Sequence, residues 1–230
     1  MSIVGLRAFA SPIGRDLEHI ERLAGLRTTD LSDGMQRSGT MSGIRSITEP
    51  ALGLLGFAVT VSVPAGGFDI IKVGLELCRP GDVLVVSARG DTLNALWGGN
   101  LSLGAQSRGL AGFVIDGAVR DIEEISELEF PVFARATAVS AGAIQCPYGE
   151  VNVPIACGGV VVNPGDLVVG DRDGIVVIRP DDVVPAVAAT RKVLAGHVSV
   201  RSTLEAGEVT SRESILARLS EHGLTMPVTT

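Results

Sequence analysis

The chain has 230 residues, a formal charge of −7 at pH 7 and a sequence pI near 5.0. Because phosphate binding needs clustered Lys and Arg, and the 19 basic residues here are scattered, the charge excludes nucleic acid as a bulk electrostatic partner. Three cysteines without a C-x-x-C pair exclude a disulfide framework and a zinc knuckle, and they favour a reducing compartment.

No segment of the chain predicts export or membrane insertion. Residues 1–16 lack a basic region followed by a long apolar run, and the most apolar internal run, 52–59, is too short to span a bilayer. We therefore expect a cytoplasmic protein with no membrane partner. One domain of about 200 residues with tails and a pair of domains are equally compatible with this length.

The first part of the chain predicts helices and then a strand–helix crossover. Apolar spacing predicts a helix over 14–26, and threonine cap residues begin a second helix over 28–35. Residues 53–63 are rich in β-branched side chains and predict a buried strand, followed by a helix over 69–77.

Two similar turns each lead into a strand. Residues 79–82 (Arg-Pro-Gly-Asp) give a type II turn signal before the apolar run 83–88. Residues 163–166 (Asn-Pro-Gly-Asp) do the same before the run 167–170. This cassette is too short for a repeat architecture, so we interpret it as two similar turns.

The stretch 98–124 has the most specific pattern. A glycine turn precedes a helix over 100–108, and a buried strand over 112–115 leads into a second turn. That second turn brings Arg120 and Asp121 to the start of another helix.

The later part of the chain predicts hairpins and then helices. A strand is expected over 131–136, and Asp173-Gly174 marks a hairpin within the alternating strands and turns of 143–178. From residue 180 onward two helices are expected, interrupted near glycines 196 and 207. A βα first half and a hairpin-rich second half favour a swivelling β/β/α domain with C-terminal helices over a doubly wound α/β sheet.

Chemistry-bearing groups gather in the stretch 98–124. The first turn of a helix leaves its amides unpaired and partly positive, so the glycine turn can bind a carboxylate. Arg120 offers a planar fork of donors to a carboxylate or a 2-oxo group, and Asp121 offers one hard oxygen to a magnesium-type cation. The pattern predicts a pocket for a small 2-oxo acid. The expected substrate-binding residues are Gly98, Gly99, Asn100, Leu101 and Arg120.

A purely structural explanation of these residues stays open. Asp121 can cap the helix that follows and form a capping box with Glu124, with Arg120 as a surface charge. In favour of a functional site, both charged groups follow a buried strand at its C-terminal end, where open α/β sheets place ligands.

Other kinds of site lack a matching pattern. The glycine turn has neither the Gly-Lys-Ser/Thr of a phosphate loop nor a dinucleotide fingerprint. His19, His197 and His222 are far apart and show no metal-ligand spacing. No serine lies in a nucleophile elbow.

Several motifs together resemble one known family. VIDGAVRD, EFPVFARA, the Arg-Pro-Gly-Asp turn and NVPIACGGVVVNPGDLVVGDRDGIVVI resemble the 4-hydroxy-4-methyl-2-oxoglutarate aldolases and the related regulators of ribonuclease activity A, the RraA-like proteins. The resemblance implies a swivelling β/β/α fold assembled as a homotrimer or hexamer, with the active site between subunits. We divide the chain into an N-terminal helical segment (1–27), an RraA-like α/β domain (28–180) and a C-terminal helical tail (181–230).

The resemblance also implies a chemistry. Aldolases of this family use a divalent cation, Mg²⁺ or Mn²⁺, to cleave 4-hydroxy-4-methyl-2-oxoglutarate or 4-carboxy-4-hydroxy-2-oxoadipate to pyruvate and a second product, and oxaloacetate decarboxylation accompanies this activity. By position, Arg120 and Asp121 would be the catalytic residues. Arg120 would contact the pyruvyl carbonyl and stabilise the enolate, Asp121 would hold the metal, and the amides of 98–101 would bind the carboxylate.

Two departures from the aldolase pattern concern the base. The family has an aspartate twenty-one residues before the arginine, where this chain has Gly99. The family also draws a C-terminal glutamate from a neighbouring subunit, where this chain offers His197 or Ser199. The residues that could replace the base are Asp91, Asp116 and Glu124.

Three functions follow from the sequence. The first is a metal-dependent lyase of a small 2-oxo acid, acting by retro-aldol cleavage or decarboxylation. The second is an enzyme that applies the same enolate chemistry to another oxo or sugar acid, for example as an isomerase. The third is a non-catalytic RraA-like regulator that binds a ribonuclease or helicase.

Overall fold

The computed structural model describes residues 3–11, 14–48, 51–142, 146–207 and 212–223. The chain divides into two compact units, Met1–Thr190 and Arg191–Thr230. Among the described residues, no helix has both the length and the apolar character needed to cross a membrane.

Within the described residues, the first unit is built on a nine-stranded mixed sheet and a separate two-stranded sheet. The strands are β1 (Leu6–Ala8), β2 (Arg45–Ser46), β3 (Leu54–Ser62), β4 (Asp82–Trp97), β5 (Gly112–Val119), β6 (Val132–Thr137), β7 (Gly149–Val151), β8 (Ile155–Cys157), β9 (Val160–Val162), β10 (Leu167–Asp171) and β11 (Gly174–Ile178). The helices of the chain are α1 (Leu17–Leu23), α2 (Thr28–Gly34), α3 (Asp69–Leu77), α4 (Gly99–Ser107), α5 (Ile122–Glu127), the 3₁₀ turn η1 (Pro180–Asp182), α6 (Val183–Glu205) and α7 (Arg212–Glu221).

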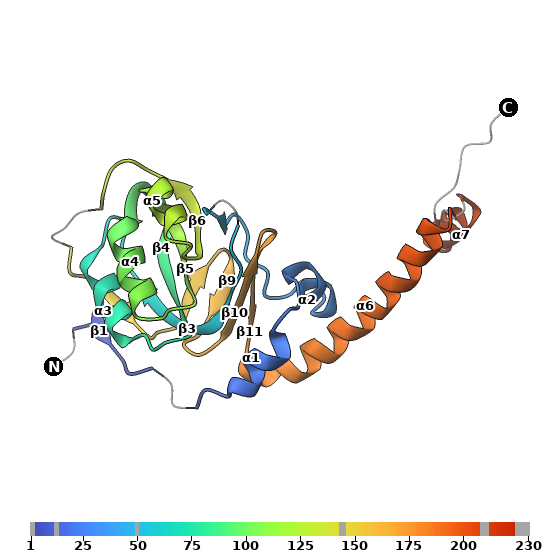
Figure 1. Cartoon of the computed structure of the whole chain (residues 1–230), viewed down its shortest axis with the longest axis horizontal. Helices are drawn as coiled ribbons and strands as arrows, with labels where there is room; N and C mark the ends of the chain where they lie inside the picture. Colours follow the sequence, from blue (N-terminus) through green and yellow to red (C-terminus); the bar gives the residue numbers. More distant parts are fainter. Residues whose placement is uncertain (1–2, 12–13, 49–50, 143–145, 208–211, 224–230) are drawn as a thin grey trace. The chain divides into compact units, whose positions relative to one another are not determined.

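Four neighbouring parallel strands form the centre of the large sheet. β3, β4, β5 and β6 pair in that order, and α3, α4 and α5 make the crossovers between them. Figure 1 shows these three helices together on one side of the sheet. On the other edge of β3, the β10–β11 hairpin adds antiparallel strands. The predicted α/β class with a hairpin-rich later half is therefore confirmed.

Alternate side chains of β4 enter two separate cores. Leu84 and Val86 pack in the cluster that includes residues of α3, α4 and α5. Val83 and Val85 pack in the cluster that includes residues of the β8–β11 region. Because successive side chains of a strand point to opposite faces, a run of four apolar residues is what a strand buried on both sides requires.

Both Pro-Gly-Asp turns have the predicted conformation. Gly81 and Gly165 have φ values of 83° and 89°, the left-handed conformation that the third position of a type II turn needs. In each turn the aspartate amide donates to the carbonyl of the first residue at 3.1 Å. The Asp82 and Asp166 carboxylates accept the amide of that first residue at 2.8 and 2.7 Å. The repeated cassette is thus one local device used twice to start a buried strand.

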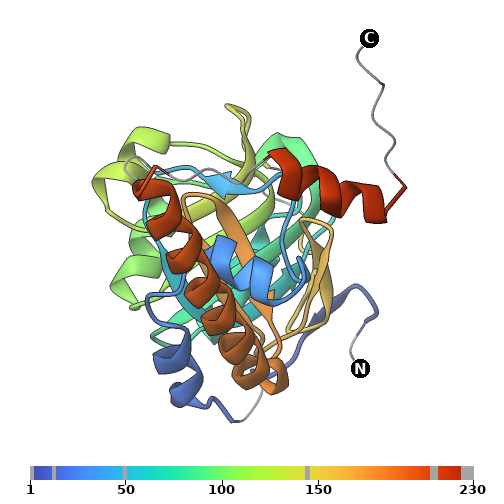
Figure 2. The same ribbon diagram turned by 90° about the vertical axis from the view of Figure 1, so that its right-hand side faces the viewer.

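β4 extends from Asp82 to Trp97, well beyond the predicted strand 83–88, and three further predicted details differ from the structure. The strand expected over 112–115 continues to Val119, because β4 on one side and β6 on the other pair with it to the end. The helix break expected near Gly196 is absent: α6 is continuous through it, as Figures 1 and 2 show. One glycine costs a helix only about 1 kcal/mol, which the rest of a long helix absorbs.

The start of α2 is the third difference. Thr28 was expected to act as a cap residue, but the N-cap position is Arg27, which makes no side-chain cap. The Asp171 carboxylate at the end of β10 accepts both the Thr28 amide at 2.8 Å and the Thr28 hydroxyl at 2.6 Å. A residue distant in sequence therefore supplies the cap.

Asp91 stabilises the irregular middle of β4. Its carboxylate accepts hydrogen bonds from the Leu93 and Asn94 amides, from the Gly66 amide and from the Asn94 side chain, at 2.8 to 3.3 Å. Partial desolvation favours the neutral acid, but these hydrogen bonds outweigh it and lower the pKa of the Asp91 carboxyl.

Asp91→Ala is expected to lower the free energy of unfolding by about 1–2 kcal/mol at neutral pH, because four donors lose their acceptor. Since the folded-state pKa lies below the unfolded value of 3.8, this stabilisation is present above that value and is lost as the pH falls through the folded-state pKa. Denaturant unfolding at a series of pH values measures the effect. The control is Glu127→Ala, an exposed carboxylate on α5. A stability difference that stays constant into acid would contradict the assignment.

Candidate functional site

The candidate site lies where β4 and β5 end side by side. These parallel strands pair through Trp97 and Val119, their last residues, and the Arg120 amide donates to the Trp97 carbonyl at 3.0 Å. Gly98 and Arg120 therefore leave the sheet together at its carboxyl edge, which is the placement predicted from the sequence.

Gly98 is the N-cap of α4, and the Asp121 carboxylate lies where a side chain of residue 98 would begin. Its backbone is extended, and its carbonyl accepts the Ser102 amide at 3.0 Å as the first hydrogen bond of the helix. A Cβ added at this residue would overlap the Asp121 carboxylate and lie 3.3 Å from Cγ of Arg120. The glycine thus lets the two charged residues approach the backbone at the start of α4.

Asp121 does not cap its own helix. Its backbone is left-handed, with φ 59° and ψ 45°, and its side chain makes no cap hydrogen bond in α5. Instead its Oδ2 accepts the Gly99 amide at 3.3 Å and lies 3.4 Å from Nε of Arg120. The predicted capping box is therefore absent. The left-handed conformation costs about 1–3 kcal/mol in a non-glycine residue, and strain of this kind is commonly found at functional sites.

The Asp121 carboxylate changes what the glycine turn can bind. We expected the free amides at the start of α4 to bind a substrate carboxylate. In the structure the Gly99 amide already donates to Asp121, so the unpaired amides of this turn that remain for a ligand are those of Asn100 and Leu101. Positive charge for an anion then has to come mainly from side chains.

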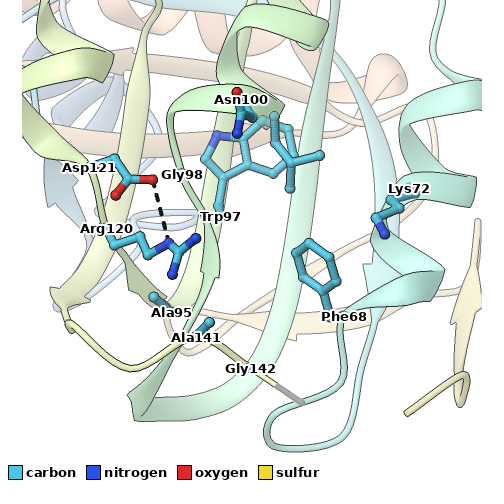
Figure 3. A pocket seen from close by; sticks show the side chains of 11 residues that line it. Phe68, Lys72, Ala95, Trp97, Gly98, Asn100, Arg120, Asp121, Ala141 and Gly142 are labelled. Carbon is cyan, nitrogen blue, oxygen red and sulfur yellow. Dashed lines mark ion pairs between the residues drawn. The ribbon is translucent and has the colours of Figure 1, made fainter. Parts of the chain in front are cut away.

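A cavity of about 290 Å³ opens beside these residues. Of the predicted site residues, Gly98, Asn100, Leu101, Arg120 and Asp121 line it, whereas Gly99 does not. Figure 3 shows Arg120 and Asp121 on one side of the cavity and Phe68 and Lys72 on the opposite side. The volume suits a small organic acid.

The sequence analysis missed several residues that line the cavity. Phe68 and Lys72 come from the start of α3, and the Lys72 ammonium lies 4.6 Å from the centre of the Phe68 ring. The sequence feature that could have indicated them is the glycine-containing loop PAGGFD before α3. This loop comes close to the site only in the folded chain. The other lining residues that were not predicted are Ala95, Trp97, Ala141 and Gly142.

Trp97 gives the cavity a rigid wall. Its ring is stacked on Phe113 with centroids 3.7 Å apart, and its indole N–H donates to the Ser102 hydroxyl at 2.7 Å. The side chain is 1% exposed, so it does not move with the solvent-facing residues. This packing fixes the end of β4 and therefore the position of Gly98.

The described residues offer one clear oxygen ligand for a cation. No three His, Cys, Asp or Glu side chains gather anywhere in the part of the chain that the structure describes. Asp121 borders the cavity, and its side chain is 38% exposed. Since Mg²⁺ keeps several waters and often takes only one or two protein carboxylates, this donor set fits a magnesium-type ion that is completed by water and substrate oxygens.

Two of the three candidate bases are engaged in structural contacts. Asp91 holds the loop of β4, as described above. Asp116 is buried, forms an ion pair with Arg135 and accepts the Gly158 amide at 2.9 Å. Glu124 is exposed, and its carboxylate forms no hydrogen bond or ion pair with the described residues. His197 and Ser199 lie in α6, in the second unit.

The fold and the cavity define a class of protein: an α/β domain that can take a small anion at the carboxyl edge of parallel strands. The chain belongs to the RraA-like family, since the family profile described as Aldolase/RraA matches residues 28–177. The family resemblance and the RraA-like α/β fold predicted from the sequence are therefore confirmed.

Named relatives come from both branches of this family. The chain is 39% identical over 165 residues to a Halalkalibacterium halodurans protein provisionally assigned as a 4-hydroxy-4-methyl-2-oxoglutarate aldolase, covering 71% of this chain and 77% of that protein. It is 36% identical over 152 residues to the 4-hydroxy-4-methyl-2-oxoglutarate aldolase of Thermus thermophilus, covering 66% and 92%. The structure of Streptomyces coelicolor RraAS2, described as an unusual member of the RNase ES inhibitor RraA protein family, matches with a TM-score of 0.73 and 28% identity, covering 83% and 99%.

The contact between Gly98 and Asp121 can be tested with a matched pair of variants. Gly98→Ala is expected to lower the free energy of unfolding by up to about 1 kcal/mol, because the new Cβ would displace the Asp121 carboxylate from the Gly99 amide. Gly104→Ala, in the same helix, meets nothing within 4 Å and is expected to raise it by about 0.5–1 kcal/mol. Denaturant unfolding gives both values. Stabilisation by both alanines would show that Asp121 does not lie against Gly98.

Proposed function

We propose that this protein is a divalent-metal-dependent carbon–carbon lyase. Its proposed reactions are retro-aldol cleavage of 2-oxo acids of the 4-hydroxy-4-methyl-2-oxoglutarate type to pyruvate, and decarboxylation of oxaloacetate. The main support is the junction of Arg120 and Asp121 with the start of α4, beside a cavity of about 290 Å³. Aldolase names among the relatives agree with it.

The side chains of the cavity suit the pyruvyl end of such a substrate. Arg120 is 46% exposed and borders the cavity, so its guanidinium can donate to the 2-oxo and carboxylate oxygens. Asp121 would hold the cation, Mg²⁺ or Mn²⁺. When bound, that ion would polarise the 2-oxo group of the substrate.

Bond cleavage then places negative charge where Arg120 can stabilise it. When the C3–C4 bond breaks, its electron pair enters the pyruvate enolate, and the proton of the C4 hydroxyl passes to a base. The Arg120 guanidinium neutralises charge that develops on the enolate oxygen, which is an interaction stronger in the transition state than in the bound substrate. The rigid Trp97 wall keeps the substrate oriented during this step.

Lys72 gives the site a second cation. It lies across the cavity from Arg120, as Figure 3 shows, and its nearest carboxylate is that of Asp69, 3.4 Å away. A substrate with a carboxylate at each end can bridge the two cations. The cavity therefore favours 2-oxo diacids over monoacids.

The alternative function is that of a ribonuclease-binding regulator. The structural similarity to Streptomyces coelicolor RraAS2, with a TM-score of 0.73, is the observation in its favour. Trimeric or hexameric assembly is part of the proposal for either function, and light scattering measures it.

The direct test is pyruvate release from 4-hydroxy-4-methyl-2-oxoglutarate and from oxaloacetate, with Mg²⁺ or Mn²⁺ and then with excess chelator. Activity is expected with the ions and should disappear with chelator. Arg120→Lys and Asp121→Asn are each expected to lower kcat/KM by at least about a hundredfold, because the first removes the planar pair of donors and the second removes the negative charge that holds the cation. Lys72→Ala is expected mainly to raise KM, by about tenfold.

The control for these variants is Arg108→Ala, which removes the C-cap arginine of α4 that pairs with Glu76 outside the cavity. It should leave turnover unchanged. If the wild-type protein releases no pyruvate with any divalent ion and binds a ribonuclease stably, the lyase proposal is wrong and the regulator function is supported.

A further inference from the structure

The space above Gly99 is already filled by a carboxylate from another helix. A Cβ added to Gly99 would overlap the carboxyl carbon and both carboxyl oxygens of Glu124. Gly99 itself is buried at the start of α4. The Glu124 side chain therefore extends from the first turn of α5 to the first turn of α4, and its charged end lies where a side chain of residue 99 would begin.

The backbone of Asp121 explains this direction. In a capping box Glu124 would turn back to the amide of the cap residue, three positions earlier. With Asp121 left-handed and its carboxylate turned to the Gly99 amide, that arrangement is not formed. The carboxylates of Asp121 and Glu124 instead converge on Gly99, the first at its amide and the second over its Cα.

Glu124 also keeps its proton-accepting capacity. Its carboxylate has no hydrogen-bond or ion-pair partner among the described residues, whereas Asp121 contacts Arg120 and the Gly99 amide. A general base needs a free lone pair and a position within one water of the proton it removes. Gly98 and Asn100, which flank Gly99, line the cavity, whereas Gly99 and Glu124 do not. A proton can therefore pass from a substrate to the Glu124 carboxylate only through a bridging water.

We propose that Glu124 replaces the side chain missing at Gly99 and serves, through one bridging water, as the proton acceptor of this site. The inference rests on the proposed lyase function. In the forward step the C4 hydroxyl gives its proton to the water as the water gives one to the Glu124 carboxylate. The C3–C4 bond breaks, the carbonyl of the second product forms, and the electron pair stays in the pyruvate enolate. Return of the proton to C3 by the same route yields pyruvate and restores the carboxylate.

The test moves the carboxylate from one helix to the other. Glu124→Gln is expected to lower kcat for pyruvate release from 4-hydroxy-4-methyl-2-oxoglutarate by about 10²–10⁴-fold with little change in KM. Glu124→Asp should retain more activity than Glu124→Gln. Adding Gly99→Asp to Glu124→Ala should restore at least about tenfold over Glu124→Ala alone, a rescue that a merely structural residue would not give.

Exchange of the pyruvate methyl protons in deuterated water, with Mg²⁺, gives a second readout that needs no aldol substrate. The exchange rate is expected to fall in the same order as kcat, from wild type through Glu124→Asp to Glu124→Gln. Glu123 is a neighbouring exposed carboxylate, and Glu123→Gln should exchange at the wild-type rate. Wild-type kcat in Glu124→Gln, or no rescue by the relocated carboxylate, would overturn the role of Glu124 while the lyase stands. If the wild-type protein shows neither pyruvate release nor proton exchange, both the proposed lyase function and the role of Glu124 are wrong.

Occupancy of the space above Gly99 is tested independently of activity. Gly99→Ala should raise the melting temperature of Glu124→Ala more than that of the wild type, because in the wild type the new Cβ must displace the Glu124 carboxylate. Equal effects of Gly99→Ala with and without Glu124 would contradict the placement of the carboxylate.

Discussion

The parallel pairing of β4 with β5 is the constraint on which the candidate site depends. It ends at Trp97 and Val119, so the chain leaves both strands at one edge, and the Arg120 amide is tied to the Trp97 carbonyl at 3.0 Å. Stacking of the Trp97 ring on Phe113 fixes the position of that edge. The glycines at the start of α4 then allow the side chains of the β5–α5 turn to lie against its backbone. Without this pairing, residues about twenty positions apart would not share a cavity.

Most of the fold could be predicted because its signals are local. The helix expected over 69–77 matches α3, the Asp173-Gly174 signal is the turn of the β10–β11 hairpin, and both Pro-Gly-Asp turns form. Most of the errors occur where contacts with residues distant in sequence determine the local structure. β4 continues through polar residues to Trp97 because β5 pairs with it across several register shifts. The cap of α2 comes from Asp171.

The residues of the candidate site likewise include some that local sequence signals predict and others that only the tertiary fold brings together. Arg120, Asp121 and the glycine turn lie in one stretch, so their approach could be predicted from strand and turn signals. Lys72 and Phe68 reach the cavity only because α3 packs on the same side of the sheet, and their local signal, the loop PAGGFD, does not show which residues they face. Glu124 fits a capping box by spacing, but in the structure Asp121 has a left-handed backbone and the Glu124 carboxylate lies over Gly99.

A crystal structure of the protein with pyruvate and Mg²⁺ tests the central claim most directly. We expect pyruvate in the cavity with its oxygens on the Arg120 guanidinium, the cation on the Asp121 carboxylate, and the Glu124 carboxylate over Gly99. Pyruvate and cation bound elsewhere, with Arg120 and Asp121 turned to solvent and Glu124 away from Gly99, would contradict it.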